Sequence, residues 1–177
     1  MEFELQEFAK TAMNEFDACL ASHGFVMVVK AIDKQLFRAD YAFGQLYVSL
    51  VASRHPRDYP PYFNVVLGEG SLDWPERDWN SVALWRLANY VEHNDEGSEF
   101  SLVQLDDTRA LVSSARASLE RYHCGFLDGD TQVFRRIRAE QTRQREPYKI
   151  HEPDGTGRYS MRYDPVSTDL KKTFSSE

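Results

Sequence analysis

The sequence is poor in the features that mark disulfide frameworks, metal sites and membrane proteins. Its 177 residues include only two cysteines, Cys19 and Cys124, which stand in no CxxC pair and beside no other metal ligands. We therefore expect no zinc site, and buried free thiols rather than a disulfide or a nucleophile. No apolar run approaches the ~18 residues that a membrane helix needs, and the start, MEFELQEFAK, lacks the regions of a signal peptide. These absences predict a cytoplasmic protein with no membrane association.

Catalytic signatures are missing as well. The sequence contains no GxSxG, HExxH or GxGxxG motif and no phosphate-binding GxxxxGK. The His-Asn-Asp-Glu turn at 93–96 has no partner ligand nearby in the sequence. We predict no catalytic residue, no metal and no cofactor. The missing signatures favour a nonenzymatic role. Whether the chain is an enzyme stays open, because five histidines and nine tyrosines have no assigned role.

Charge is unevenly distributed along the chain. Residues 1–129 contain 20 acidic and 11 basic residues, which gives a net charge of −9. Residues 130–177 contain 8 acidic and 10 basic residues, which gives a net charge of +2. An acidic body disfavours nucleic acid, which needs a cationic face, and it favours encounter with a basic protein. Acidity for solubility alone is the competing interpretation. The dense arginines at 135–145 either meet a phosphate or contact the acidic body of the same molecule.

Hydrophobic periodicity in the first half predicts a helix followed by a four-stranded meander. Apolar residues recur at helical spacing over 3–22, and Gly24 suits the left-handed residue after a helix. Tight turns at 31–34 and 43–44 separate short apolar or alternating runs, which are typical of strands. The strands are expected at 25–30, 35–42, 45–52 and 62–67.

The second half predicts further helices and a tail. Helices are expected at 79–92, from a cap at Asp106 or Asp107 to 123, and from Asp128 or Asp130 to 146, with a short strand at 99–105. We thus predict one α+β domain over 1–146, an antiparallel four-stranded meander packed by the N-terminal helix and several C-terminal helices. Residues 147–177 show no period but keep four aromatic residues. They predict an irregular tail that docks on the body or on a partner, with disorder as the alternative.

Aromatic residues beside carboxylates form the candidate binding surface. Trp85 falls on the inward face of its helix and is expected in the core, whereas one of Trp74 and Trp79 is expected to be exposed. Exposed aromatics flanked by acids are typical of a binding hot spot. Packing between helix and sheet, and helix capping by the aspartates, are the competing interpretations. The candidate residues are Tyr59, Tyr62, Asp73, Trp74, Asp78 and Trp79.

The order of elements resembles a class of small bacterial domains. The helix, Gly24-Phe25, the meander, the strand with Asn64 and the helix with Trp85 are similar to α+β domains of unknown function found among immunity proteins of polymorphic toxin systems. The resemblance covers about residues 8–92 and implies a noncatalytic protein-binding module. Such a module would occlude a basic partner through an acidic, aromatic-bearing surface.

Two other functions remain as hypotheses. One is a small-ligand binder or enzyme with a pocket between the sheet and the helices. The other is an oligomer in which the tail is exchanged between protomers. The sequence does not decide among the three.

Overall fold

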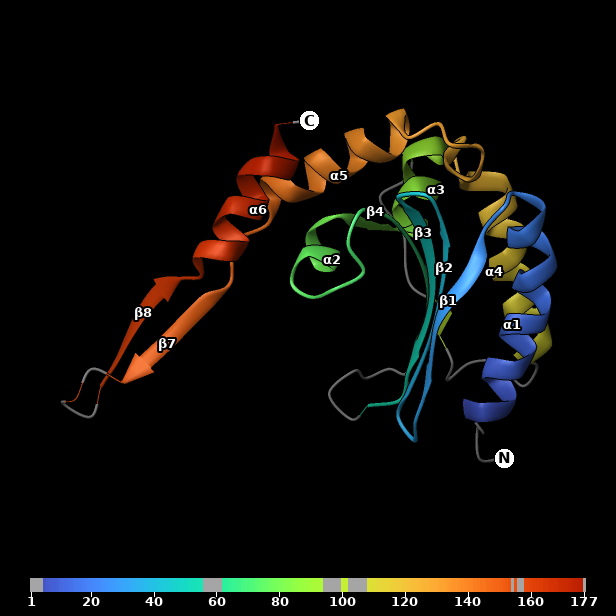
Figure 1. Cartoon of the computed structure of the whole chain (residues 1–177), viewed down its shortest axis with the longest axis horizontal. Coiled ribbons are helices and arrows are strands. Elements are labelled where there is room, and N and C mark those ends of the chain that lie inside the picture. The colour runs from blue at the N-terminus through green and yellow to red at the C-terminus, as the bar shows by residue number, and fades with distance from the viewer. Residues whose placement is uncertain are drawn as a thin grey trace.

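An antiparallel sheet built from consecutive strands lies at the centre of the molecule (Figure 1). The computed structural model describes residues 5–55, 62–93, 100–101, 108–153, 155 and 158–176. The strand order is β1-β2-β3-β4-β5, and β6 pairs with β4 outside this path. The strands are β1 (Val26–Ile32), β2 (Leu36–Phe43), β3 (Leu46–Ser53), β4 (Tyr62–Glu69), β5 (Ser81–Ala83) and β6 (Phe100–Ser101). The predicted four-stranded meander is confirmed, and β5 extends it by one strand.

Helix α1 (Leu5–Ser22) packs on one face of the sheet, with α4 (Thr108–Tyr122) beside it. The Phe8 ring of α1 meets the Phe63 ring of β4 edge to face, with centroids 5.1 Å apart. The buried face of α1 is the apolar stripe that the helical spacing predicts. Its buried residues are Leu5, Phe8, Ala9, Ala12, Met13, Phe16 and Leu20.

The opposite face of the sheet is unusually polar. The antiparallel register places Arg38 opposite Val51, Asp40 opposite Ser49 and Val51 opposite Asn64, so these side chains share one face. The short helix α2 (Glu76–Trp79) lies against this face. Tyr47 also belongs to this face of the sheet, and its hydroxyl donates a 2.5 Å hydrogen bond to Oδ1 of Asn80, the residue after α2.

The expected helix at 79–92 is wrong in its first part. α2 ends at Trp79, Ser81–Ala83 forms β5, and α3 (Leu84–Glu92) begins only afterwards. Pairing with β4 explains the difference, because residues 81–83 satisfy the backbone groups of a free strand edge. The expected strand at 99–105 lies mostly outside the described residues. The two later helices match α4 and α5 (Gln132–Gln144), and the 3-10 turn η1 (Phe126–Asp128) lies between them.

The expectation of an irregular tail is wrong for most of that segment. Strands β7 (Lys149–Pro153) and β8 (Tyr159–Tyr163) form an antiparallel hairpin, and α6 (Pro165–Ser175) follows. The Asp164 carboxylate accepts a hydrogen bond from the Ser167 backbone N–H, and Pro165 takes the first helical turn, so α6 has a regular start signal. α6 packs on α5 and buries Phe174, while the hairpin projects away from the sheet (Figure 1).

In the part of the chain that the structure describes, no helix combines the length and the apolarity needed to cross a membrane.

Candidate functional site

An exposed tryptophan stands on the loop that leads into α2. The Trp74 side chain is 73% exposed. Its indole stacks on the Tyr148 ring, with centroids 5.8 Å and planes 21° apart. Stacking on a second ring holds the indole in one orientation although solvent reaches most of it.

Tyr148 is itself held by a charged network that joins α2 to the end of α5. Its hydroxyl donates a 2.6 Å hydrogen bond to Asp78 Oδ2, and Arg145 donates to the same oxygen at 3.0 Å. The Arg145 guanidinium also lies 4.4 Å from the centre of the Trp79 ring. Burial, and then the bond to Asp78, raise the pKa of Tyr148 to about 12, so this hydroxyl remains a donor at neutral pH.

Two carboxylates next to Trp74 have no cationic partner among the described residues. Asp73 is exposed and Glu76 is half-buried, and neither takes part in an ion pair there. Asp78, by contrast, is neutralised by Arg145. The surface around the Trp74 indole is therefore acidic. We call Asp73, Trp74, Glu76 and Tyr148 the Trp74 surface.

The residues predicted from sequence are only partly brought together. Trp74 is the exposed tryptophan, and Trp79, only 1% exposed, packs edge to face on Tyr148. Tyr62 lies on the polar face of the sheet, where it lines a small cavity together with Asp78. Tyr59 lies outside the described residues. The expectation that Trp85 lies in the core is wrong, because its side chain is half-buried and lines a groove between α3 and α5.

Sequence reasoning missed Tyr148 and Arg145 as members of this surface. Both lie far along the chain from Trp74, so no local pattern connects them. The available signal was that aromatic residues persist in the segment after 146, where a solvated tail has little use for them. The arginines at 135–145 were expected to meet a phosphate or to contact the acidic body of the same molecule. The second interpretation is confirmed for three of them, because Arg135 and Arg138 pair with Glu69 and Arg145 pairs with Asp78.

A second polar cluster lies beneath α2. Arg38 and Arg77 approach the two oxygens of Asp40 at 2.5 Å and 3.5 Å, and Asp40 is completely buried. Burial lowers the pKa of the Arg77 guanidinium. A cavity of about 190 Å³ adjoins the cluster and is lined in part by Asn64 and Tyr62. The two arginines compensate the buried carboxylate, so the cluster is internally paired and holds α2 on the sheet.

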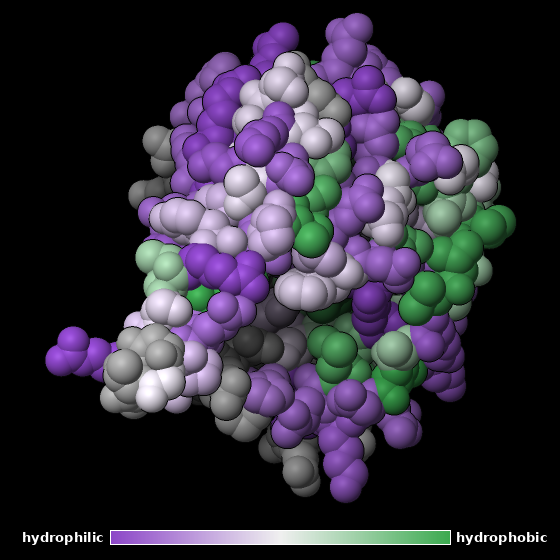
Figure 2. Space-filling model, turned by 60° about the vertical axis from the view of Figure 1, so that its left-hand side comes forward, coloured by the Kyte–Doolittle hydropathy of each residue, from purple (hydrophilic) through white to green (hydrophobic). Residues whose placement is uncertain are grey.

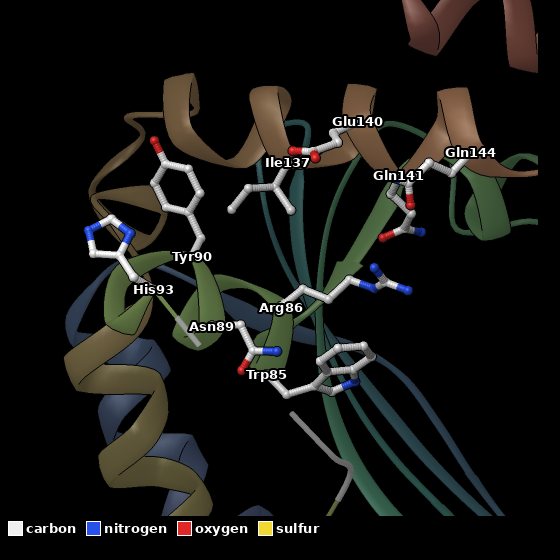
Figure 3. A pocket seen from close by; sticks show the side chains of 9 residues that line it. All are labelled: Trp85, Arg86, Asn89, Tyr90, His93, Ile137, Glu140, Gln141 and Gln144. Carbon is white, nitrogen blue, oxygen red and sulfur yellow. The ribbon is translucent and has the colours of Figure 1, made fainter. Parts of the chain in front are cut away.

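A larger groove of about 570 Å³ runs between α3 and α5 (Figure 3). The Arg86 guanidinium lies 4.6 Å from the centre of the Trp85 ring and makes no ion pair with the described residues. In Figure 3 the end of the Gln141 side chain reaches from α5 toward Arg86. The groove is open and lined mainly by amide and charged groups, a composition that suits a polar ligand.

Two helix ends bring histidines together that the sequence separates. His23 Nδ1 lies 2.9 Å from Asp128 Oδ1, and the His23 and His123 rings lie 6.0 Å apart. Burial lowers the pKa of His123 and raises the pKa of the neighbouring Cys124 thiol. A thiol with a raised pKa is a poor nucleophile at neutral pH. The similar sequences Ser-His-Gly-Phe at 22–25 and His-Cys-Gly-Phe at 123–126 occur at these two adjacent helix ends. Each contains a glycine in the left-handed conformation that ends a helix, since Gly24 and Gly125 both have φ +84°.

Comparison with known proteins finds no relative: no family model, no curated protein and no solved structure matches the chain. The likeness to immunity proteins thus stays a prediction from the sequence. Within the described ranges no group of three or more histidine, cysteine, aspartate and glutamate side chains is placed to hold a metal ion.

Proposed function

We propose that this chain is a noncatalytic protein-binding module that occludes a basic protein partner with the Trp74 surface. The observation that carries the proposal is the exposed indole of Trp74, stacked on a tyrosine that is itself fixed by Asp78 and Arg145. Tryptophan, tyrosine and arginine are the residues that most often dominate binding energy. An indole already held in place loses little freedom when a partner covers it.

Charge around the indole supports a basic partner. Asp73 and Glu76 lack ion-pair partners among the described residues, so a lysine or arginine of the partner can pair with them. The net charge of −9 on residues 1–129 adds a long-range attraction toward the same basic partner. In the immunity-type role that the sequence resemblance implies, such occlusion would block the partner's own activity.

A capture experiment tests the proposal. The wild type, Trp74→Ala and Val91→Ala are immobilised, and the protein retained from an extract of the source cells is identified and quantified. Val91 is a matched control because it is also an exposed apolar residue, on α3. We expect a basic protein to be retained equally by the wild type and Val91→Ala, and at least about tenfold less by Trp74→Ala. Equal retention by Trp74→Ala, or an acidic protein as the main captured species, would overturn the proposal.

One observation favours a second function, a small-ligand binder that uses the groove between α3 and α5. Arg86 is half-buried there, stacked on Trp85, and has no carboxylate partner among the described residues. Such an arginine suits an anionic ligand. This function predicts that small dicarboxylates raise the melting temperature of the wild type and not that of Arg86→Gln. No rise for either protein would exclude it.

A further inference from the structure

The dipeptide Asp-Trp occurs twice in a short stretch of the chain, at 73–74 and at 78–79. The second of these, in α2, already contacts a cation of the same chain. The Arg145 guanidinium lies 4.4 Å from the centre of the Trp79 ring and donates a 3.0 Å hydrogen bond to Asp78 Oδ2. One planar cation thus contacts the indole and the carboxylate of two neighbouring residues at the same time.

Trp74 differs from the other two tryptophans in having no such cation. Trp85 has the Arg86 guanidinium 4.6 Å from the centre of its ring. Among the described residues, by contrast, no cation lies over the Trp74 ring. Tyr148 stacks on one face of the indole, yet the side chain remains 73% exposed, so the other face is open to a group from outside the chain.

The carboxylate beside Trp74 also has no cationic partner. Asp73 is exposed and makes no ion pair with the described residues, whereas Asp78 is paired with Arg145. The two Asp-Trp dipeptides therefore offer the same two side-chain groups, but only the second is paired within the chain. Their backbones differ, because 73–74 precedes α2 and 78–79 lies within it, so the likeness is one of chemical groups.

Arginine suits this pair of groups better than lysine does. A guanidinium is flat and weakly hydrated, so it stacks on an indole while its in-plane N–H groups donate to a carboxylate. An ammonium is a compact, strongly hydrated charge that does not stack. Figure 2 brings forward the side of the molecule on which α2 and the hairpin lie, and this face is largely hydrophilic, with hydrophobic residues gathered along one side. A polar, charged partner surface matches such a face.

We propose that the partner residue recognised by the Trp74 surface is an arginine, whose guanidinium stacks on the open face of Trp74 and donates to the Asp73 carboxylate. This inference rests on the proposed binding function and adds the chemical identity of the group that is bound. It makes the Trp74 surface selective for a guanidinium over an ammonium of equal charge, so a partner surface that carries only lysine binds more weakly.

Nuclear magnetic resonance of the full chain tests the proposal with two tripeptides of equal charge, acetyl-Gly-Arg-Gly-amide and acetyl-Gly-Lys-Gly-amide. The signal followed is the indole N–H of Trp74, which is identified by its loss from Trp74→Phe. The arginine peptide is expected to shift this signal and to bind at least about threefold more tightly than the lysine peptide. The indole N–H of Trp79, which is buried, should not shift with either peptide.

Two variants separate a local contact from general attraction to an acidic protein. Asp73→Asn and Glu7→Gln each remove one exposed negative charge, but Glu7 lies on α1, across the sheet from α2. Asp73→Asn should weaken binding of the arginine peptide about threefold, whereas Glu7→Gln should leave it nearly unchanged. Equal binding of the two peptides, no shift with either, or equal weakening by the two variants would each overturn the proposal.

These outcomes are distinct from those of the capture experiment. If a basic protein is retained through Trp74 but the two peptides bind equally, the binding function stands and arginine recognition fails. If the arginine peptide is preferred but no protein is retained, arginine recognition stands and the binding function fails. Sedimentation of the wild type covers the remaining case, because self-association that is lost in Trp74→Ala would assign the arginine to a second copy of the chain and overturn a separate partner.

Discussion

Trp74 and Tyr148 stack face to face, although one lies before α2 and the other just before β7. The contact connects the loop beside the sheet to the base of the projecting hairpin. Since Asp78 and Arg145 fix the tyrosine hydroxyl, the exposed indole is presented on a rigid support. A surface built in this way is expected to contribute to binding without contributing much to stability.

The two neighbouring tryptophans should therefore respond to substitution in opposite ways. Trp79→Ala is expected to lower the free energy of unfolding by about 3–5 kcal/mol, because this side chain is buried and packs on Tyr148 and Arg145. Trp74→Ala is expected to change it by no more than about 0.5 kcal/mol. Urea unfolding of both variants measures the difference. A Trp74→Ala variant as unstable as Trp79→Ala would show that the indole is a structural residue.

Glu69 should make α5 sensitive to acid. Hydrogen bonds from Arg135 hold the pKa of Glu69 below its ordinary value of 4.5, and Arg138, nearly fully buried, pairs with the same carboxylate at 3.3 Å. Glu69→Gln removes the carboxylate that pairs with both Arg135 and Arg138, and it is expected to cost about 3 kcal/mol at neutral pH. Because the folded pKa is depressed, this contribution is present above pH 4.5 and is lost as the pH falls through the folded value.

Unfolding of the wild type and Glu69→Gln over a pH series measures this effect. Their difference in stability should be constant near neutrality and should shrink below pH 4.5. Asp169→Asn is the control, since it removes only an exposed pair with Lys172 and should cost less than about 1 kcal/mol. A Glu69→Gln deficit that does not change with pH contradicts the assignment.

Local patterns in the sequence were sufficient to predict the central fold. The stripe of α1 repeats every turn, and the meander consists of neighbouring strands joined by tight turns, so each contact depends on residues close in sequence. The start of α3 was misplaced because β5 is set by pairing with β4, which helical spacing does not report. The hairpin was missed although Tyr159, Met161 and Tyr163 alternate with polar residues. Five residues are too few for that alternation to stand out.

The candidate site was less accessible to sequence reasoning. The short range around α2 could be selected because tryptophans and acids cluster there, but the partners of Trp74 and Asp78 come from the segment after α5. Which of Trp74 and Trp79 is exposed depends on that segment as well. Long-range pairings of this kind have no periodic signal.

Gly68 should be intolerant of any side chain. It lies opposite Tyr47 in the β3–β4 register, and a Cβ at this position would overlap the Tyr47 ring. Tyr47 is buried and held by Asn80, so it cannot move aside. Gly68→Ala is expected to destabilise the protein by about 1–3 kcal/mol. Combining it with Tyr47→Phe, which keeps the ring, should give no relief, whereas Tyr47→Ala should absorb much of the clash. Wild-type stability for Gly68→Ala contradicts this packing.

The two thiols should be unreactive in the folded protein. Burial raises the pKa of both Cys19 and Cys124 above the ordinary value of 9.0, with Glu120 adding to the effect at Cys19. At pH 7 alkylation by iodoacetamide is therefore expected to be at least about tenfold slower in the native chain than in urea. The Cys19→Ala, Cys124→Ala double variant should fold with a loss of at most a few kcal/mol. Equal native and unfolded alkylation rates would show that the thiols are accessible and that folding does not raise their pKa.

The most direct test of the proposed binding function is the salt dependence of association. The rate constants for the captured basic partner are measured by stopped flow or surface plasmon resonance, for the wild type, Asp73→Asn and Trp74→Ala. The wild-type association rate should fall steeply as ionic strength rises from 0.01 to 0.1 M, where the screening length shrinks from about 30 Å to about 10 Å. Asp73→Asn should flatten this dependence, and Trp74→Ala should mainly accelerate dissociation. An association rate indifferent to salt, together with unchanged dissociation from Trp74→Ala, would contradict the account.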